Sequence, residues 1–302
     1  MLLATAVLAV GAGRVDGSTA AVRRPAREAL PAVRDPVAHF QAQLDAGEVV
    51  LAHDSALGYL PAVLTALHIP VSSQALVFSR TSLQTDKITP WSPRAIYFSD
   101  DVYIGYVQES TFLEIAAVDP VYGAVFYTLS QEPRARPVFS RETTTCLMCH
   151  QSRLATGRDT TAGVQPGGGP AARLRRDVER LVRAMLFVGE APFDGPVRGT
   201  TTFAADFPQA GPRDARGRSL RDLDLTRRLF TYPLSFLIYS DSFDALPALA
   251  KGEVYRQLDD VLGATHTPSE FAHLQPADRT AILQILTATK PDFAAWRRAA
   301  GR

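Results

Sequence analysis

The chain has 302 residues, and 46% of them are hydrophobic, which is enough to build a sizeable core in one large domain or two small ones. Its 32 basic and 31 acidic residues leave a formal net charge of +1, and this near balance argues against a nucleic-acid-binding protein. The two cysteines lie three positions apart, so the chain has no framework of disulfides.

The first twenty residues are typical of a signal peptide or N-terminal anchor. Leu2 to Gly13 are apolar or small apart from Thr5, and small residues follow, but a basic beginning is missing. The apolar run is too short to span a bilayer. We therefore expect an exported protein, periplasmic or secreted, with a buried N-terminal helix or an uncleaved tether as the alternative. Residues 21–35, rich in Ala, Arg and Pro, are interpreted as a linker.

Two helices are expected next. Asp35-Pro36 is typical of a helix start, and Gly47 is expected to end that first helix. Leucines and a valine at helical spacing predict a second helix over Ala56 to Leu67, which must end before Pro70 because a residue that precedes proline avoids the helical region.

A block of β-branched and aromatic runs follows the helices. Short turn signals separate the runs, among them Asp100-Asp101 and Asp119 to Gly123. Connections this short make neighbouring strands antiparallel, so we expect a β-meander of four or five strands from about Leu76 to Gln131. The expected strands are 76–78, 95–98, 102–107, 112–118 and 124–129.

The motif with chemical meaning is Cys146-Leu147-Met148-Cys149-His150. Two thiols at this spacing can each form a thioether with a haem vinyl group, and the adjacent His150 then offers its ring nitrogen to the iron as the proximal ligand. The chain therefore predicts one covalently attached haem c. A redox-active disulfide and half of a zinc site are the alternatives; the first expects a βαβ context, and the second would need two distant histidines.

The region after the motif is expected to be mainly helical. A Gly-rich connection over 163–170 leads to a helix over Asp177 to Val188, and Pro192 to Arg221 is expected to be mostly irregular. Further helices are expected over 234–239, 246–262 and 276–289. The expected fold is α+β, with residues 36–140 forming N-terminal helices plus the antiparallel β-meander and residues 141–302 forming the haem region and C-terminal helices.

The sequence does not decide which residue is the sixth iron ligand. Met185 is a candidate distal ligand, although its place on an apolar helical stripe also fits core packing. His53 and His68 flank the second expected helix and are further candidates, while a water-bound or open site is the remaining option. His266, His273 and His39 fit the ligand role less well.

Several polar residues have simpler interpretations. Arg153 and Arg158 can pair with haem propionates or be solvated, and Asp100-Asp101 is explained by turn chemistry.

Five stretches of the chain carry a resemblance to known sequences: SSQALVFSRTSLQ, PRAIYFSDDVYIGYV, EIAAVDPVYGAVFYTLSQ, CLMCH and RRLFTYPLSFLIYSDSFDALP. They resemble a family of uncharacterised exported bacterial proteins described as cytochrome c domain-containing. The resemblance runs from about Leu51 to Lys290 and implies haem attachment at Cys146 and Cys149 with His150 as proximal ligand. Some relatives carry a longer insert rich in Trp and Gly after the motif, and contacts made by such an insert do not carry over to this chain.

The function expected from these observations is electron transfer through the covalent haem, with an unidentified redox partner protein. No acid–base residue is needed for such a role, so an electron carrier is favoured over an enzyme. The alternatives are a haem enzyme with an open distal site, peroxidase-like, and a haem-based sensor. No nucleic-acid partner is expected, and a membrane enters only through an uncleaved N-terminal segment.

Overall fold

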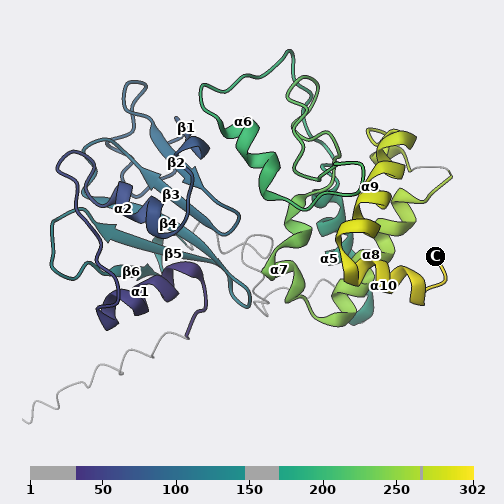
Figure 1. Ribbon diagram of the computed structural model, residues 1–302, viewed down its shortest axis with the longest axis horizontal. Coiled ribbons are helices and arrows are strands. Elements are labelled where there is room, and N and C mark those ends of the chain that lie inside the picture. Colours follow the sequence, from purple (N-terminus) through teal and green to yellow (C-terminus); the bar gives the residue numbers. More distant parts are fainter. Residues whose placement is uncertain (1–31, 147–169, 266–267) are drawn as a thin grey trace, which may run out of the picture. The chain divides into compact units, whose positions relative to one another are not determined.

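The computed structural model describes residues 32–146, 170–265 and 268–302 (Figure 1). The expected signal peptide or anchor at 1–20 and most of the linker at 21–35 lie outside the described residues. Residues Val33–Arg302 form one compact unit. None of the described helices is long and apolar enough to cross a membrane.

The N-terminal half is built on a six-stranded antiparallel sheet with the strand order β1-β2-β3-β4-β5-β6. Every strand pairs with its neighbour in sequence, so the expected meander and the α+β class are confirmed. The strands are β1 (Ala75–Val77), β2 (Arg94–Phe98), β3 (Val102–Tyr106), β4 (Phe112–Asp119), β5 (Gly123–Ser130) and β6 (Phe139–Glu142).

The sixth strand was not expected from the sequence. In β6 only Phe139 is buried, and the polar residues that follow it give no apolar run. The strand forms because β5 offers it a free edge, with Leu129 opposite Phe139 and Phe126 opposite Glu142. Strand pairing, rather than local composition, therefore decides this element.

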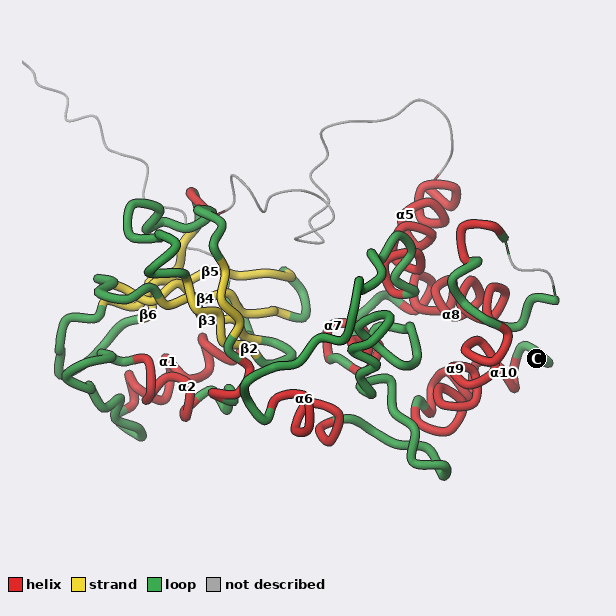
Figure 2. Tube along the Cα trace, turned by 90° about the horizontal axis from the view of Figure 1, so that it is seen from above, coloured by secondary structure: helices red, strands yellow, loops and turns green. Residues whose placement is uncertain are grey.

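The two helices before the sheet cover one of its faces (Figure 2). Helix α1 (Pro36–Ala46) begins and ends as expected: the Asp35 carboxylate accepts hydrogen bonds from the Val37 and Ala38 amides at 2.9 and 3.0 Å, and Gly47 ends the helix at φ 72°. The positive φ is one that glycine adopts without a Cβ clash.

Helix α2 (Leu60–Ala66) is shorter than the expected helix over 56–67. The Asp54 carboxylate accepts hydrogen bonds from the Ala56 and Leu57 amides, both at 2.8 Å, and this local bonding holds residues 54–58 in a turn instead of a helix. Leu57 is consequently exposed rather than on the buried face. At the other end, His68 takes the left-handed conformation at φ 53°.

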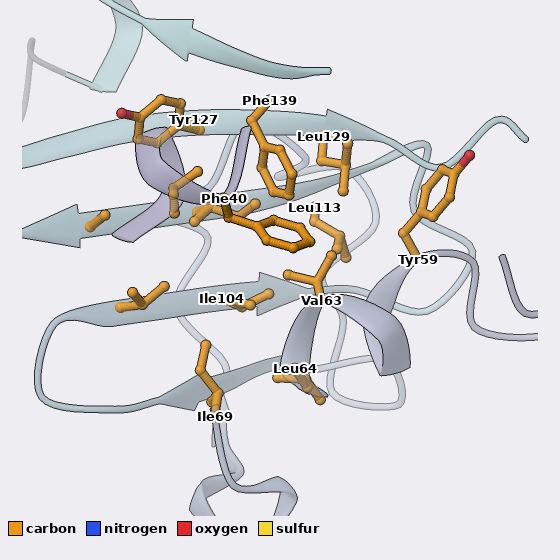
Figure 3. Packing of buried hydrophobic residues seen from close by; sticks show 14 of the residues in the cluster. Phe40, Tyr59, Val63, Leu64, Ile69, Ile104, Leu113, Tyr127, Leu129 and Phe139 are labelled. Carbon is orange, nitrogen blue, oxygen red and sulfur yellow. The ribbon is translucent and has the colours of Figure 1, made fainter. Parts of the chain in front are cut away.

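The core of this half lies between the helices and the sheet. Figure 3 shows Phe40 of α1 and Val63 and Leu64 of α2 turned toward side chains of the strands. Alternate residues of the long strands supply the other side, as the two-residue period of a strand requires. The strand residues labelled there are Ile104, Leu113, Tyr127, Leu129 and Phe139.

Helix α5 (Pro170–Met185) begins and ends earlier than the expected helix over 177–188. Its first turns are made of Ala, Arg and Leu, which favour helix even without an apolar stripe. It ends at Met185 because Phe187 adopts φ 55°, which a helix cannot continue. Val178, Val182, Met185 and Leu186 are buried as expected, but Leu181 is exposed.

The C-terminal helices pack with α5 around a second cluster of buried residues, separate from the first. The helix expected over 276–289 is confirmed, the one over 246–262 begins two residues later, and the one over 234–239 is a short 3-10 turn. The expected irregular stretch 192–221 holds two short elements, and α7 and α10 were not expected. The elements are α6 (Phe203–Asp206), η2 (Phe207–Ala210), η3 (Phe236–Tyr239), α7 (Asp241–Asp244), α8 (Ala248–Leu262), η4 (Ser269–Phe271), α9 (Pro276–Thr289) and α10 (Pro291–Ala299), with η1 (Val71–Ser73) in the other half.

Candidate functional site

Cys146 is the one member of the CxxCH motif that lies within the described residues. Residues 143–145 separate it from the end of β6, it forms the start of a helical turn with Thr145, and its side chain is partly exposed. Cys149 and His150, together with Arg153, Arg158 and the Gly-rich connection, lie outside the described residues.

The chain that leads to Cys146 is anchored on the sheet. The Phe139 amide donates to the side-chain oxygen of Gln41 at 2.7 Å, and the Phe139 ring meets Phe40 edge-to-face at 6.0 Å between ring centroids. Strand pairing continues to Glu142, so only residues 143–145 separate the last paired residue from Cys146. The paired strand therefore fixes the chain as far as Glu142, shortly before the first thiol.

A row of side chains crosses the sheet and ends at Glu142, the last paired residue before Cys146. Phe98, Tyr103, Ala116, Phe126 and Glu142 are paired in succession across β2 to β6. They alternate with the buried core residues and so lie on the sheet face opposite α1 and α2. Two of the rings, Phe98 and Tyr103, stack at 6.2 Å between centroids. The alternation of the aromatic residues can be predicted from the sequence, but their alignment across the sheet depends on strand register.

The donor chemistry of the motif fits a c-type haem. A thiol must be accessible to react with a vinyl group, and the partly exposed Cys146 side chain meets this condition.

Met185, the candidate distal ligand, ends α5 and is 6% exposed within the second core cluster. Its carbonyl accepts the Ser235 amide at 2.8 Å, which ties the end of α5 to the loop before η3. This placement is what core packing requires of a methionine.

His53 lies outside any helix, and one of its ring nitrogens forms a hydrogen bond with the sheet half. Its Nε2 lies 2.8 Å from the Gln131 carbonyl, and because a carbonyl can only accept, Nε2 carries the hydrogen. The ring also contacts Tyr59 edge-to-face, at 4.8 Å between centroids. The Nδ1 lone pair is the one that His53 can offer to a metal.

The other histidines are spread over both halves. His68 and His39 are exposed, and His273 donates from Nε2 to the Leu186 carbonyl at the end of α5, at 2.7 Å. His266 lies outside the described residues. Within the described residues, no three His, Cys, Asp or Glu side chains gather in a way that could hold a metal ion.

Asp100 and Asp101 form the tip of the β2–β3 hairpin, as expected, but Asp100 has a further partner. It pairs with Arg221, a buried arginine whose guanidinium lies over the Phe207 and Phe236 rings at 4.7 and 4.2 Å. Burial, together with the charges of Asp100 and Asp241, raises the pKa of Asp101. The turn interpretation is therefore incomplete for Asp100.

No protein-family model, curated protein or solved structure matches the chain.

Proposed function

We propose that this protein is an exported mono-haem c-type cytochrome that transfers electrons through haem bound covalently to Cys146 and Cys149. The observation that carries the proposal is the CxxCH motif made from the chain's two cysteines. The placement of Cys146 supports it, because the thiol follows a paired strand and is partly exposed.

The residues have separate roles in this proposal. Cys146 and Cys149 fix the macrocycle by thioether bonds, and His150 supplies the proximal nitrogen. The haem, when bound, supplies an iron that accepts or gives one electron. The sheet contributes a fixed starting point at Glu142, which limits the positions that the attached group can take. Met185 stays a candidate for the distal position, with His53 and His68 as the other candidates and an open or water-bound site as the remaining option.

The proposal is tested by producing the chain with its own N-terminal segment in a bacterium that matures c-type cytochromes. We expect a Soret band that survives denaturation and acid–acetone extraction, because thioether-bound haem is not extracted. Cys146→Ser together with Cys149→Ser should abolish the retained pigment. Met148→Leu, a change within the motif that leaves both thiols and the imidazole in place, should retain it.

An uncoloured wild-type protein, or pigment that the acid–acetone step removes, would contradict haem attachment. The N-terminal sequence of the exported protein tests localisation separately, since cleavage near residue 20 is expected for a signal peptide. The response of the reduced protein to carbon monoxide tests the electron-transfer role: a six-coordinate iron ignores it, whereas rapid binding indicates an open site and contradicts a simple carrier.

A further inference from the structure

Buried cations in this protein are matched by carboxylates, with one exception among the described residues. Arg221 pairs with Asp100, and Lys290 lies 2.5 Å from Asp244. Arg279, on α9, is 7% exposed and has no ion pair in the described part of the chain. A buried charge is costly unless it is paired, so Arg279 calls for an explanation.

The contacts of Arg279 leave most of its guanidinium unused. Nη1 donates to the Ala264 carbonyl at 2.5 Å, and the buried Nε has no hydrogen-bond partner among the residues that the structure describes. Other arginines here also have an unpartnered Nε, but their guanidiniums are neutralised; Arg228, for example, lies 3.0 Å from Asp278. Arg279 therefore combines an unsatisfied donor with an unneutralised charge.

The hydrogen bond to Ala264 does not by itself compensate for the burial of the Arg279 charge. Ala264 follows the C-terminal end of α8, where the helix dipole places a partial negative charge that attracts a cation. That partial charge is about half an elementary charge, and one carbonyl uses one of the five N–H donors of the guanidinium. Of the remaining donors, Nε is buried and has no acceptor among the described residues.

Helices α8, α9 and α10 pack together in the C-terminal half (Figure 1). A cavity of about 600 Å³ that is open to solvent is lined by residues of these helices, Arg279 among them. Its walls are both apolar and cationic. Arg297 adds a second guanidinium, held at 2.6 Å from Asp259. The lining includes Leu262, Pro276, Arg279, Thr280, Leu283 and Arg297.

We propose that this cavity binds a small organic carboxylate, with the Arg279 guanidinium holding the carboxylate and the apolar part of the ligand lying against Leu262 and Leu283. A guanidinium presents paired N–H donors that match the two oxygens of a carboxylate. The leucines account for an organic acid rather than an inorganic anion, since they give an apolar group a surface to cover. The site lies apart in sequence from the CxxCH motif and does not depend on haem.

Benzoate is a suitable probe, and benzamide is its matched neutral control, because the two share a ring and differ in charge. Titration calorimetry of the purified full chain should show binding of benzoate and none of benzamide. Arg279→Gln should weaken benzoate binding by about tenfold or more, the loss expected for hydrogen bonds to a charged group. Arg198→Gln, at an exposed arginine that does not line the cavity, should leave the affinity unchanged.

Thr280→Trp provides a second, independent test because Thr280 is exposed at the cavity wall and its replacement fills the space without disturbing the core. This variant should also lose benzoate binding while keeping its circular dichroism spectrum, and it decides the matter if Arg279→Gln does not fold. Failure of the wild type to bind benzoate overturns the proposal, as does equal binding of benzamide or full affinity in a folded variant. A haem-free result in the pigment experiment leaves these outcomes unaffected.

Discussion

The Tyr127 hydroxyl donates a 2.6 Å hydrogen bond to Oδ2 of Asp35, which lies 92 positions earlier in the sequence. The other oxygen of Asp35 caps α1 through the Val37 and Ala38 amides. One buried carboxylate thus joins the start of α1 to strand β5. Burial and the Asp35 charge raise the pKa of Tyr127, so the phenol stays protonated as the donor.

Tyr127→Phe should therefore destabilise the sheet half. The substitution leaves one oxygen of a buried carboxylate without its donor, and such a loss costs about 1–3 kcal/mol. Urea unfolding followed by circular dichroism measures the difference. Tyr103→Phe, on the exposed side of the sheet, is the matched control and should change the free energy of unfolding by less than about 0.5 kcal/mol. Equal effects of the two substitutions would disprove the role of the Asp35–Tyr127 bond.

Glu114 is expected to stabilise the fold by neutralising the charge of Arg94. Its carboxylate lies 3.1 Å from the Arg94 guanidinium and also accepts the Leu83 amide at 2.5 Å, and both side chains are about 15% exposed. Glu114→Ala leaves the charge of Arg94 unpaired and poorly hydrated, which should lower the free energy of unfolding by roughly 3 kcal/mol. The double variant Glu114→Leu with Arg94→Met removes both charges and should recover part of this loss. If the double variant is less stable than Glu114→Ala, the pairing argument is wrong.

A fall in pH should destabilise the C-terminal half, in part because Glu253 becomes protonated. Hydrogen bonds from Arg256 are the main cause that lowers the pKa of Glu253, from 4.5 to about 2. Burial opposes this effect, and the hydrogen bond from Gln257 adds to it. A carboxylate whose pKa is lowered by folding contributes stability above its unfolded pKa, and this contribution is lost as the pH falls through the folded value.

The free energy of unfolding of the wild type should therefore fall more steeply than that of Glu253→Gln between about pH 4.5 and pH 2. Glu132→Gln provides the control, since Glu132 pairs with Arg134 through two side chains that are 75% and 61% exposed, and exposed pairs contribute little. Parallel curves for the wild type and Glu253→Gln would contradict the lowered pKa.

Met185→Leu separates packing from ligation. Leucine keeps the volume and apolar character that the second core cluster requires, so the change should cost less than about 1.5 kcal/mol. From the burial of Met185 we expect the absorption spectrum of the haem-loaded protein to stay unchanged in both oxidation states. A loss of the low-spin spectrum in a folded Met185→Leu protein would instead identify Met185 as the distal ligand.

Local signals in the sequence were sufficient for many element ends. Asp35 with Pro36 and Gly47 defines α1 because a cap and a left-handed terminus act within a few residues. Asp119 in the β4–β5 turn behaves likewise, since its carboxylate accepts the amides of Val121 and Tyr122. The second helix was predicted to begin at Ala56 and begins at Leu60, because the apolar spacing was read without the competing turn at Asp54.

The sequence by itself determined the antiparallel meander, the helical character of the C-terminal part and the thiol–imidazole motif, because each depends on neighbours within one strand, turn or helix. Only the tertiary structure decided that β6 forms, that Asp35 meets Tyr127, and that Arg279 is buried without a carboxylate partner in the described part of the chain. These features depend on contacts between residues far apart in the chain. A cation such as Arg279 is ordinary in a sequence, and its meaning arises when packing removes the water that would otherwise solvate it.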